Sequence, residues 1–216
     1  MIKPVLIIGG GGHAKVLLEM LRGSGTEVLG IISTLPVSAS EVFDNLMIYS
    51  SDSDVLSFDH KDVLLVNGVG SLPGNGIRHE IHRKFKTLGY TFGTVIAPSA
   101  IVSKYAKLHE GVQIFPGAVV NAGADIGEST IVNTRAVIDH DCELGAFNHI
   151  APGAVLSGGV VSGVNVHIGP GAVLTQSVEI GRDSFIGAGT SVVKDIAARS
   201  VVIPSAVRLR ARVKDE

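Results

Sequence analysis

The stretch IGESTIVNTRAVIDHDCELGAFNHI, from Ile126 to Ile150, carries an aliphatic residue at every sixth position. The same step continues without an insertion from Ile96 to Val192, and sixteen of these seventeen positions are aliphatic, with Ser162 the exception. A period of six matches neither an α-helix nor an alternating strand. Four residues after most of these positions stands a small or β-branched residue: Ala100, Ala106, Val112, Ala118, Ala124, Thr130, Ala136 and Cys142.

A six-residue repeat predicts a parallel β-helix of triangular section, in which each hexad forms one side and three hexads make an 18-residue coil. The aliphatic residue points inward and stacks on its counterpart in the next coil, so that several coils together bury a core. Glycine, Asn and Asp suit corner turns with positive φ. We therefore expect a β-helix domain over residues 95–196 and a tail over residues 197–216.

Residues 1–94 follow a different pattern, in which short apolar runs alternate with helical periodicity. Strands are expected at 5–8, 28–32 and 63–66, and helices at 13–21 and 77–88, the second ended by Gly89. This alternation predicts an α/β domain with a small Rossmann-like parallel sheet. Residues 33–62 are poorly patterned, and we expect a loop with a weak helix there.

The composition narrows the class of protein. The chain has 216 residues, 45% of them hydrophobic, and a formal net charge of −2 with no basic block. A nucleic-acid-binding protein would normally carry a basic stripe, so we expect no nucleic-acid partner. No apolar run is long enough to span a membrane, so we expect no membrane partner. The single cysteine, Cys142, excludes an intrachain disulfide. Because the first residues enter a strand directly, unlike a signal peptide, we expect a cytoplasmic protein.

Four glycines separate the first predicted strand from the first predicted helix. The segment from Gly9 to Ala14 fits the pattern G-x-G-x-x-A, which can place a phosphate at the N-terminus of a helix. An NAD site would also need an acidic residue at the end of the second strand, where this chain has Ser33 and Thr34. The segment therefore indicates a phosphate or nucleotide site other than NAD, or else a tight turn with only a structural role.

The hexad from Val137 to Cys142 places His140 outside the predicted core, with Asp141 beside it. An imidazole accepts a proton near neutral pH, and a neighbouring carboxylate raises its basicity and holds its tautomer. One coil later the stacked position is Gly158, whose N–H could approach a developing oxyanion. We predict that His140 is a general base, against the alternative of a solvated histidine on the surface of a solenoid.

The other histidines and the cysteine have less specific surroundings. His149 faces a different side of the coil from His140 and is 18 residues from His167, so those two rings could simply stack. Cys142 occupies a small-residue core position. The histidine spacing lacks the close pair that a β-helix zinc site needs, so we expect no metal. The histidines expected at the surface are His60, His79, His82 and His109.

The two halves together resemble the hexapeptide-repeat, left-handed β-helix sugar O/N-acetyltransferases of the sialic-acid and bacillosamine pathways. The resemblance rests on the segment from Ile7 to Lys15, on the Asn67-Gly68-Val69-Gly70 turn with Arg78, and on the span from Asn133 through His140 to Gly153. It implies left-handed coils, acetyl-CoA as cosubstrate, and a homotrimer whose sites lie between subunits.

The resemblance also implies a nucleotide-sugar site in the N-terminal domain. Gly11, Gly12 and His13 would hold the diphosphate side, and Ser33 and Thr34 would face the nucleoside. Relatives tend to carry acidic residues at those last two positions, which leaves uracil and guanine both open as the base. The remaining residues implied for this substrate are Gly68, Gly70, Arg78 and Asn133.

By the same resemblance, His140 would deprotonate the acceptor amine, with Asp141 tuning its basicity. Because no Ser or Cys stands convincingly beside a base, we expect direct attack of the amine on the thioester, without an acyl-enzyme. Pro152, Pro170 and Ala188 form a column with an 18-residue spacing that could line the pantetheine track. The residues implied for acetyl-CoA are His149, Gly158, Pro170 and Ala188.

The implied activity is acetylation of the 4-amino group of a UDP-linked amino-dideoxy sugar. Three alternatives stay open from the sequence. They are N-acetylation of GDP-perosamine, O-acetylation of sialic acid, and a non-catalytic β-helix used for assembly or ligand sensing.

Overall fold

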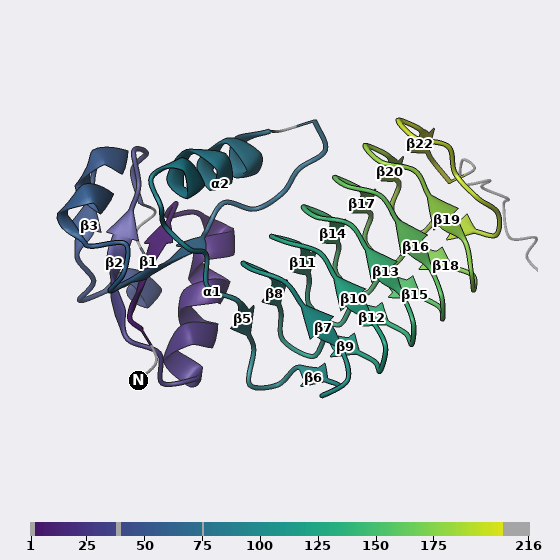
Figure 1. Ribbon diagram of the computed structural model, residues 1–216, viewed down its shortest axis with the longest axis horizontal. Coiled ribbons are helices and arrows are strands. Elements are labelled where there is room, and N and C mark those ends of the chain that lie inside the picture. Colours follow the sequence, from purple (N-terminus) through teal and green to yellow (C-terminus); the bar gives the residue numbers. More distant parts are fainter. Residues whose placement is uncertain (1–2, 38–39, 75, 205–216) are drawn as a thin grey trace, which may run out of the picture.

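The computed structural model describes residues 3–37, 40–74 and 76–204, and it has two parts. Figure 1 shows an α/β part, in purple and blue, at one end of a stack of coils that runs through green to yellow. The helix α2 (Ile77–Thr87) lies along one side of the molecule, and the segment before it reaches the middle coils, where the Ser71 carbonyl contacts His149.

The α/β part is a four-stranded parallel sheet of order β3-β2-β1-β4. Its strands are β1 (Val5–Ile8), β2 (Val28–Ile32), β3 (Ile48–Tyr49) and β4 (Leu64–Asn67), and its first helix is α1 (Gly12–Gly23). The expected strands and helices are confirmed within one or two residues. The weak helix expected between 33 and 62 is instead two 3₁₀ helices, η1 (Glu41–Phe43) and η2 (Asp52–Ser57), with β3 between them. A two-residue edge strand is too short to show a periodic pattern.

The β-helix has sheets of seven, six and five parallel strands. Residues 18 apart pair in register, as Val137 does with Val155, which confirms the predicted coil. The strands are β5 (Val95–Ile96), β6 (Ile101–Val102), β7 (Lys107–Leu108), β8 (Gln113–Ile114), β9 (Val119–Val120), β10 (Asp125–Ile126), β11 (Ile131–Val132), β12 (Val137–Ile138), β13 (Glu143–Leu144), β14 (His149–Ile150), β15 (Val155–Leu156), β16 (Val161–Ser162), β17 (His167–Ile168), β18 (Val173–Leu174), β19 (Glu179–Ile180), β20 (Phe185–Ile186), β21 (Ser191–Val192) and β22 (Val201–Val202).

The core of the β-helix is the column of hexad residues. Every one of them from Ile114 to Val192 is buried, and the small residues at the corners, Cys142 among them, fill the space beside them. The residues of the first coil are less buried, since no coil precedes it. This confirms the predicted inward position of the aliphatic residues.

The corners share one backbone feature. A residue at every sixth position from Gly111 to Gly189 has a positive φ. From Gly123 onward its N–H donates to a carbonyl of the preceding coil, as from Asp141 to the Ala122 carbonyl at 3.1 Å. Glycine and Asn or Asp were expected at these corners, but Ser, Arg and Phe also occur. The non-glycine residues are Ser129, Arg135, Asp141, Phe147, Asn165, Ser177 and Asp183.

Ser162, the one polar residue of the core column, is part of a buried hydrogen-bond chain. It is 5% exposed, and its hydroxyl accepts a hydrogen bond from the side chain of Asn148 at 2.6 Å. The amide oxygen of Asn148 in turn accepts from the backbone N–H of Val166 at 2.6 Å. A local polar contact therefore explains the break in the aliphatic column.

The seven-stranded sheet is the side of the prism that packs against the α/β part. Ala97, Phe115 and Ile131 share one hydrophobic cluster with Leu17 and Leu18 of α1. The two parts are thus joined by an apolar core rather than by a linker alone.

His82 lies in this junction, so the prediction that it is a surface residue is wrong. It is 5% exposed; Nδ1 hydrogen-bonds the Ser129 hydroxyl at 2.9 Å and Nε2 the Glu128 carboxylate at 3.0 Å. Its ring stacks on Phe92. A helix face that a second domain covers cannot be told from an exposed one by periodicity. The neighbouring His79 is half-buried and stacks on Phe147, whereas His60 and His109 lie at the surface as expected.

The predicted boundary at residue 196 lies within the β-helix. β22 pairs with β20 through Phe185 and Val201, so the seven-stranded sheet continues to Val202. The remainder of the predicted tail, residues 205–216, lies outside the described residues. Among the described helices, none combines the length and hydropathy needed to cross a bilayer.

Candidate active site

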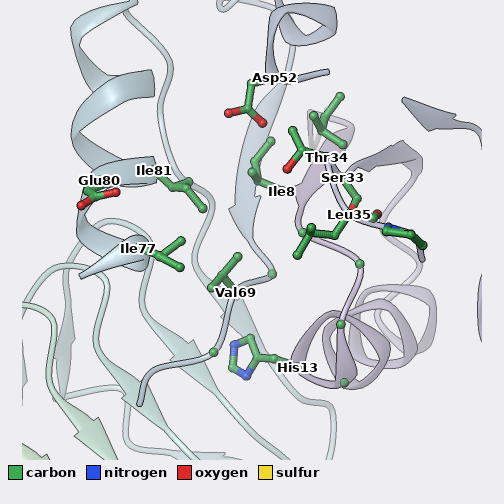
Figure 2. A pocket seen from close by; sticks show the side chains of 18 of the residues that line it. Ile8, His13, Ser33, Thr34, Leu35, Asp52, Val69, Ile77, Glu80 and Ile81 are labelled. Carbon is green, nitrogen blue, oxygen red and sulfur yellow. The ribbon is translucent and has the colours of Figure 1, made fainter. Parts of the chain in front are cut away.

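A cleft of about 910 Å³ opens at the carboxyl ends of the parallel strands, between α1 and α2. Figure 2 shows His13 at one end of this cleft and Asp52 at the other, with Ser33, Thr34 and Leu35 between them. Ligands of open α/β sheets bind at this edge. The fold therefore brings together the glycine turn and the end of β2, as the sequence predicted.

Gly11 and Gly12 stand at the start of α1, which has no acidic residue in its first turn. A Cβ at either position would meet nothing within 4 Å, so there is open space beside both residues. Free N–H groups at a helix N-terminus favour an anion. This arrangement suits a phosphate group next to Gly11 and Gly12.

Gly68 and Gly70 have closer neighbours. A Cβ on Gly68 would lie 2.9 Å from the Gly9 carbonyl oxygen, so Gly68 lets the turn after β4 approach the glycine turn. A Cβ on Gly70 would lie 3.5 Å from the Cβ of His13. Both line the cleft, and Gly68 in addition shapes it.

Arg78 does not line the cleft, although it was predicted to contact the substrate. It is 3% exposed, and its guanidinium donates to the carbonyls of Asn67, Val69 and Ser129 at 2.8 to 3.4 Å. Burial lowers its pKa to about 9. Arg78 thus ties the turn after β4 to the β-helix. A buried guanidinium and a ligand-binding one carry the same sequence signal, which is why the sequence misled here.

Three charged residues at the far end of the cleft carry no recognisable signal in the sequence. They are Asp52 of η2 and Glu80 and Lys84 of α2, all in its lining. Lys84 donates to the Asp52 carboxylate at 2.8 Å. η2 lies in the poorly patterned stretch, and only the fold brings it beside α2.

His140 and Asp141 occupy a corner between the six-stranded and five-stranded sheets. The Nδ1–H of His140 donates to Asp141 at 2.8 Å, which leaves Nε2 bare. Asp139 accepts from the backbone N–H of His140 at 2.7 Å and from the Asn121 amide at 2.8 Å. The bond to Asp141, and then the charge of Asp139, raises the pKa of His140. The ring of His140 is therefore oriented so that Nε2 is available to accept a proton, as a general base would require.

Gly158 lies against this ring, as the 18-residue spacing predicted. A Cβ on Gly158 would lie 2.5 Å from Nε2 of His140, so only glycine lets the ring rest on the next coil. The Gly158 N–H makes no hydrogen bond within the described part of the chain. A bare imidazole nitrogen thus lies against a glycine whose own N–H is free, and acyl transfer needs a proton acceptor and an N–H donor of this kind.

His149 and Asn133 lie on another side of the prism. The Nδ1–H of His149 donates to the Ser71 carbonyl and its Nε2 accepts from the Asn133 amide, both at 3.1 Å. Burial, and then the neighbouring His167, lowers the pKa of His149 to about 3. Its ring contacts that of His167 edge to face at 4.7 Å, the contact the sequence left open. His149 holds the segment after β4 against the β-helix, so its role toward acetyl-CoA stays a prediction.

The predicted cofactor column is at the surface. Pro152, Pro170 and Ala188 are exposed at the corner between the seven-stranded and six-stranded sheets. His140 lies at the corner opposite the seven-stranded sheet, whereas the cleft belongs to the domain packed on that sheet. One chain therefore keeps its base and its cleft on different sides. Within the described residues, no three His, Cys, Asp or Glu side chains converge as metal ligands.

Known proteins resemble both halves. A family model described as the PglD N-terminal domain matches residues 4–85. A variant of perosamine N-acetyltransferase from Caulobacter crescentus, solved with CoA and GDP-perosamine, is 36% identical with a TM-score of 0.83 over 93% of each chain. The acetyltransferase domain of PglB from Neisseria gonorrhoeae, solved with acetyl coenzyme A, is 32% identical with a TM-score of 0.84, over 93% of this chain and 96% of that one. No curated protein sequence matches the chain.

The likeness extends over both domains at more than 30% identity, which confirms the left-handed β-helix behind a small α/β domain. WeeI from Acinetobacter baumannii, at 19% identity and a TM-score of 0.78, shares the fold. The chain belongs to the hexapeptide-repeat sugar N-acetyltransferases and is an acetyl-CoA-dependent acyltransferase.

Proposed function

We propose that the enzyme transfers the acetyl group of acetyl-CoA to the 4-amino group of a nucleotide-linked amino-dideoxy sugar. The observation that carries the proposal is the His140–Asp141 pair resting on Gly158. The open glycine turn of the cleft supports a diphosphate in the acceptor.

The bare Nε2 of His140 takes a proton from the acceptor amine while the amine nitrogen attacks the carbonyl carbon of the thioester. The C–N bond forms, the oxyanion is stabilised by the N–H of Gly158, and the C–S bond then breaks. The proton held by His140 passes to the leaving CoA sulfur. The products are the N-acetylated sugar and free CoA, with no acyl-enzyme.

A homotrimer would bring the two halves of the site together. The outward residues of the six-stranded sheet from Ile101 to Val173 form an aliphatic column beside the His140 corner, and Ile101 is 67% and Val173 is 42% exposed. The corresponding residues of the five-stranded sheet are mostly charged, as at Lys107, Asp125 and Glu143. An exposed apolar column of this kind favours contact with another protein surface. We infer that it packs against a second copy, whose cleft faces His140.

The proposal also concerns which base, uracil or guanine, the nucleotide carries. A UDP-linked sugar was expected from the sequence, but the Asp52–Lys84 pair favours guanine. A carboxylate beside an ammonium presents two acceptors and a donor, which match the N1–H, N2–H and O6 of guanine. Uracil would set its second carbonyl against the carboxylate. The likeness to an enzyme solved with GDP-perosamine supports the same choice.

A competition between acceptors tests the proposal. CoA thiol release would be measured with a UDP-linked 4-amino-dideoxy sugar, GDP-perosamine and free sialic acid. We expect turnover of a nucleotide amino sugar, with GDP-perosamine preferred if Asp52 and Lys84 read the base. In that case, Asp52→Asn should reduce the preference between the two nucleotides. Turnover of sialic acid alone would contradict N-acetylation and leave the glycine turn a structural role.

A further inference from the structure

Gln113 is a polar residue buried between the two domains. It points outward from β8 on the seven-stranded sheet, is 1% exposed, and lies under the α/β part. Its side chain joins two groups of that domain. Nε2 donates to the Asn67 carbonyl at 2.9 Å, and Oε1 lies 2.8 Å from Nε2 of His13.

The direction of these hydrogen bonds is fixed at one end. A backbone carbonyl can only accept, so the Gln113 amide nitrogen must face Asn67. Its oxygen then faces His13, and the His13 nitrogen in that contact must carry the proton. His13 is therefore protonated on Nε2, and Nδ1 has a free lone pair.

The surroundings of His13 keep its ring neutral. Burial, and then the charge of Arg78, lowers its pKa to about 4. Within the described residues, Nδ1 has no hydrogen-bond partner. Figure 2 places the ring at the end of the cleft below Val69.

We propose that Gln113 is a positioning residue that holds His13 as a pure hydrogen-bond acceptor, so that Nδ1 receives an N–H or O–H of the acceptor sugar. The proposal rests on the proposed function for the identity of that ligand. It changes the role expected for His13, because a phosphate oxygen without a proton has nothing to donate to Nδ1. The diphosphate is then left to the N–H groups of Gly11 and Gly12, and His13 recognises the amino or hydroxyl groups of the sugar.

The first test is the tautomer of His13 in the wild-type protein. Nitrogen-15 NMR of the histidine rings at pH 7, with His13 assigned by its loss in His13→Phe, should show a protonated Nε2 and a bare Nδ1. A protonated Nδ1, or a ring protonated on both nitrogens, would overturn the proposal. This measurement needs no substrate, so it stands apart from the failure of the proposed function.

The second test separates positioning from structure. In Gln113→Leu no oxygen faces His13, so its tautomers should mix and the KM of the amino-sugar acceptor should rise about tenfold, with the KM of acetyl-CoA unchanged. Gln113→Glu keeps an oxygen toward Nε2, so that nitrogen should stay protonated. If Gln113→Leu does not fold, Gln113→Glu carries the test. An unchanged tautomer in Gln113→Leu, or a bare Nε2 in Gln113→Glu, would refute the role of Gln113.

Discussion

His140 differs from His13 and His149 in the direction in which its surroundings shift its pKa. The pKa of His140 is raised, first by the hydrogen bond to Asp141, whereas burial lowers the pKa of His13 to about 4 and that of His149 to about 3. Of these three, only His140 has its pKa shifted upward from the usual value near 6.5. The pH dependence of turnover should therefore report His140.

The replacement Asp141→Asn tests this assignment. A base works only when deprotonated, so wild-type kcat/KM should fall as the pH drops through the raised pKa of His140. Without the carboxylate that pKa falls, so the acid limb should move to lower pH and the plateau should drop. The measurement is the pH profile of kcat/KM for both proteins. An acid limb at the same pH in both would contradict the role of Asp141.

Gly158 is the other residue that fixes the position of the base. A methyl group there would push the His140 ring off the next coil, since its carbon would lie 2.5 Å from Nε2. We expect Gly158→Ala to lower kcat at least about tenfold while the protein stays folded. Gly76→Ala is the matched control, because its methyl group would approach only the end of Glu80 at 3.9 Å. Equal kcat in the two variants would show that the ring does not need this contact.

At the residue scale, sequence reasoning succeeded where the repeat fixes geometry. The spacing of 18 placed Gly158 against His140 because coils stack in register. It failed for Arg78 and His82 and did not single out Gln113, and all three lie where the α/β domain covers the β-helix. Gln113 occupies an outward hexad position, which reads as surface until the second domain is in place.

At the element scale, the corners of the β-helix carry backbone strain at non-glycine residues. Ser177 has a φ of 57°, and its neighbour Gln176 has an ordinary φ. The left-handed conformation costs an L-residue about 1 kcal/mol or more, and glycine much less. Glycine at an ordinary position instead increases the entropy lost on folding.

Ser177→Gly should therefore stabilise the protein by about 1 kcal/mol, and Gln176→Gly should destabilise it. Thermal unfolding of the two variants measures this, with an expected rise of about 2–4 °C for Ser177→Gly. The two substituted positions are adjacent on the same exposed corner, so their surroundings are similar. A lower midpoint for Ser177→Gly than for Gln176→Gly would show that the corner conformation is not strained.

The strands of the β-helix were predictable because a long, unbroken six-residue period fits a parallel β-helix and neither an α-helix nor an alternating strand. β3 and the two 3₁₀ helices were not, since they lie at the sheet edge in segments too short to hold a period. The end of the β-helix was also missed. β22 follows a break in the hexad spacing after β21, so the repeat alone could not extend to it.

At the scale of the whole molecule, the base and the cleft lie on different sides of one chain. If the working site joins the cleft of one copy to His140 of another, two inactive variants should restore each other. Gly12→Trp fills the cleft, because Gly12 faces open space there, and His140→Ala removes the base. Co-expressed as a mixed oligomer, they should regain acetyl transfer that neither has alone. No recovery in a confirmed mixed oligomer would contradict a shared site.

The central claim is that His140 acts as the general base of acetyl transfer to a nucleotide-linked amino sugar. The most direct measurement is the kcat of CoA thiol release by the wild type and His140→Ala, with the best acceptor of the panel and with folding checked by thermal unfolding. The account predicts a loss of at least about 100-fold in kcat, the usual scale of general base catalysis, with little change in stability. Turnover by His140→Ala near that of the wild type would contradict it.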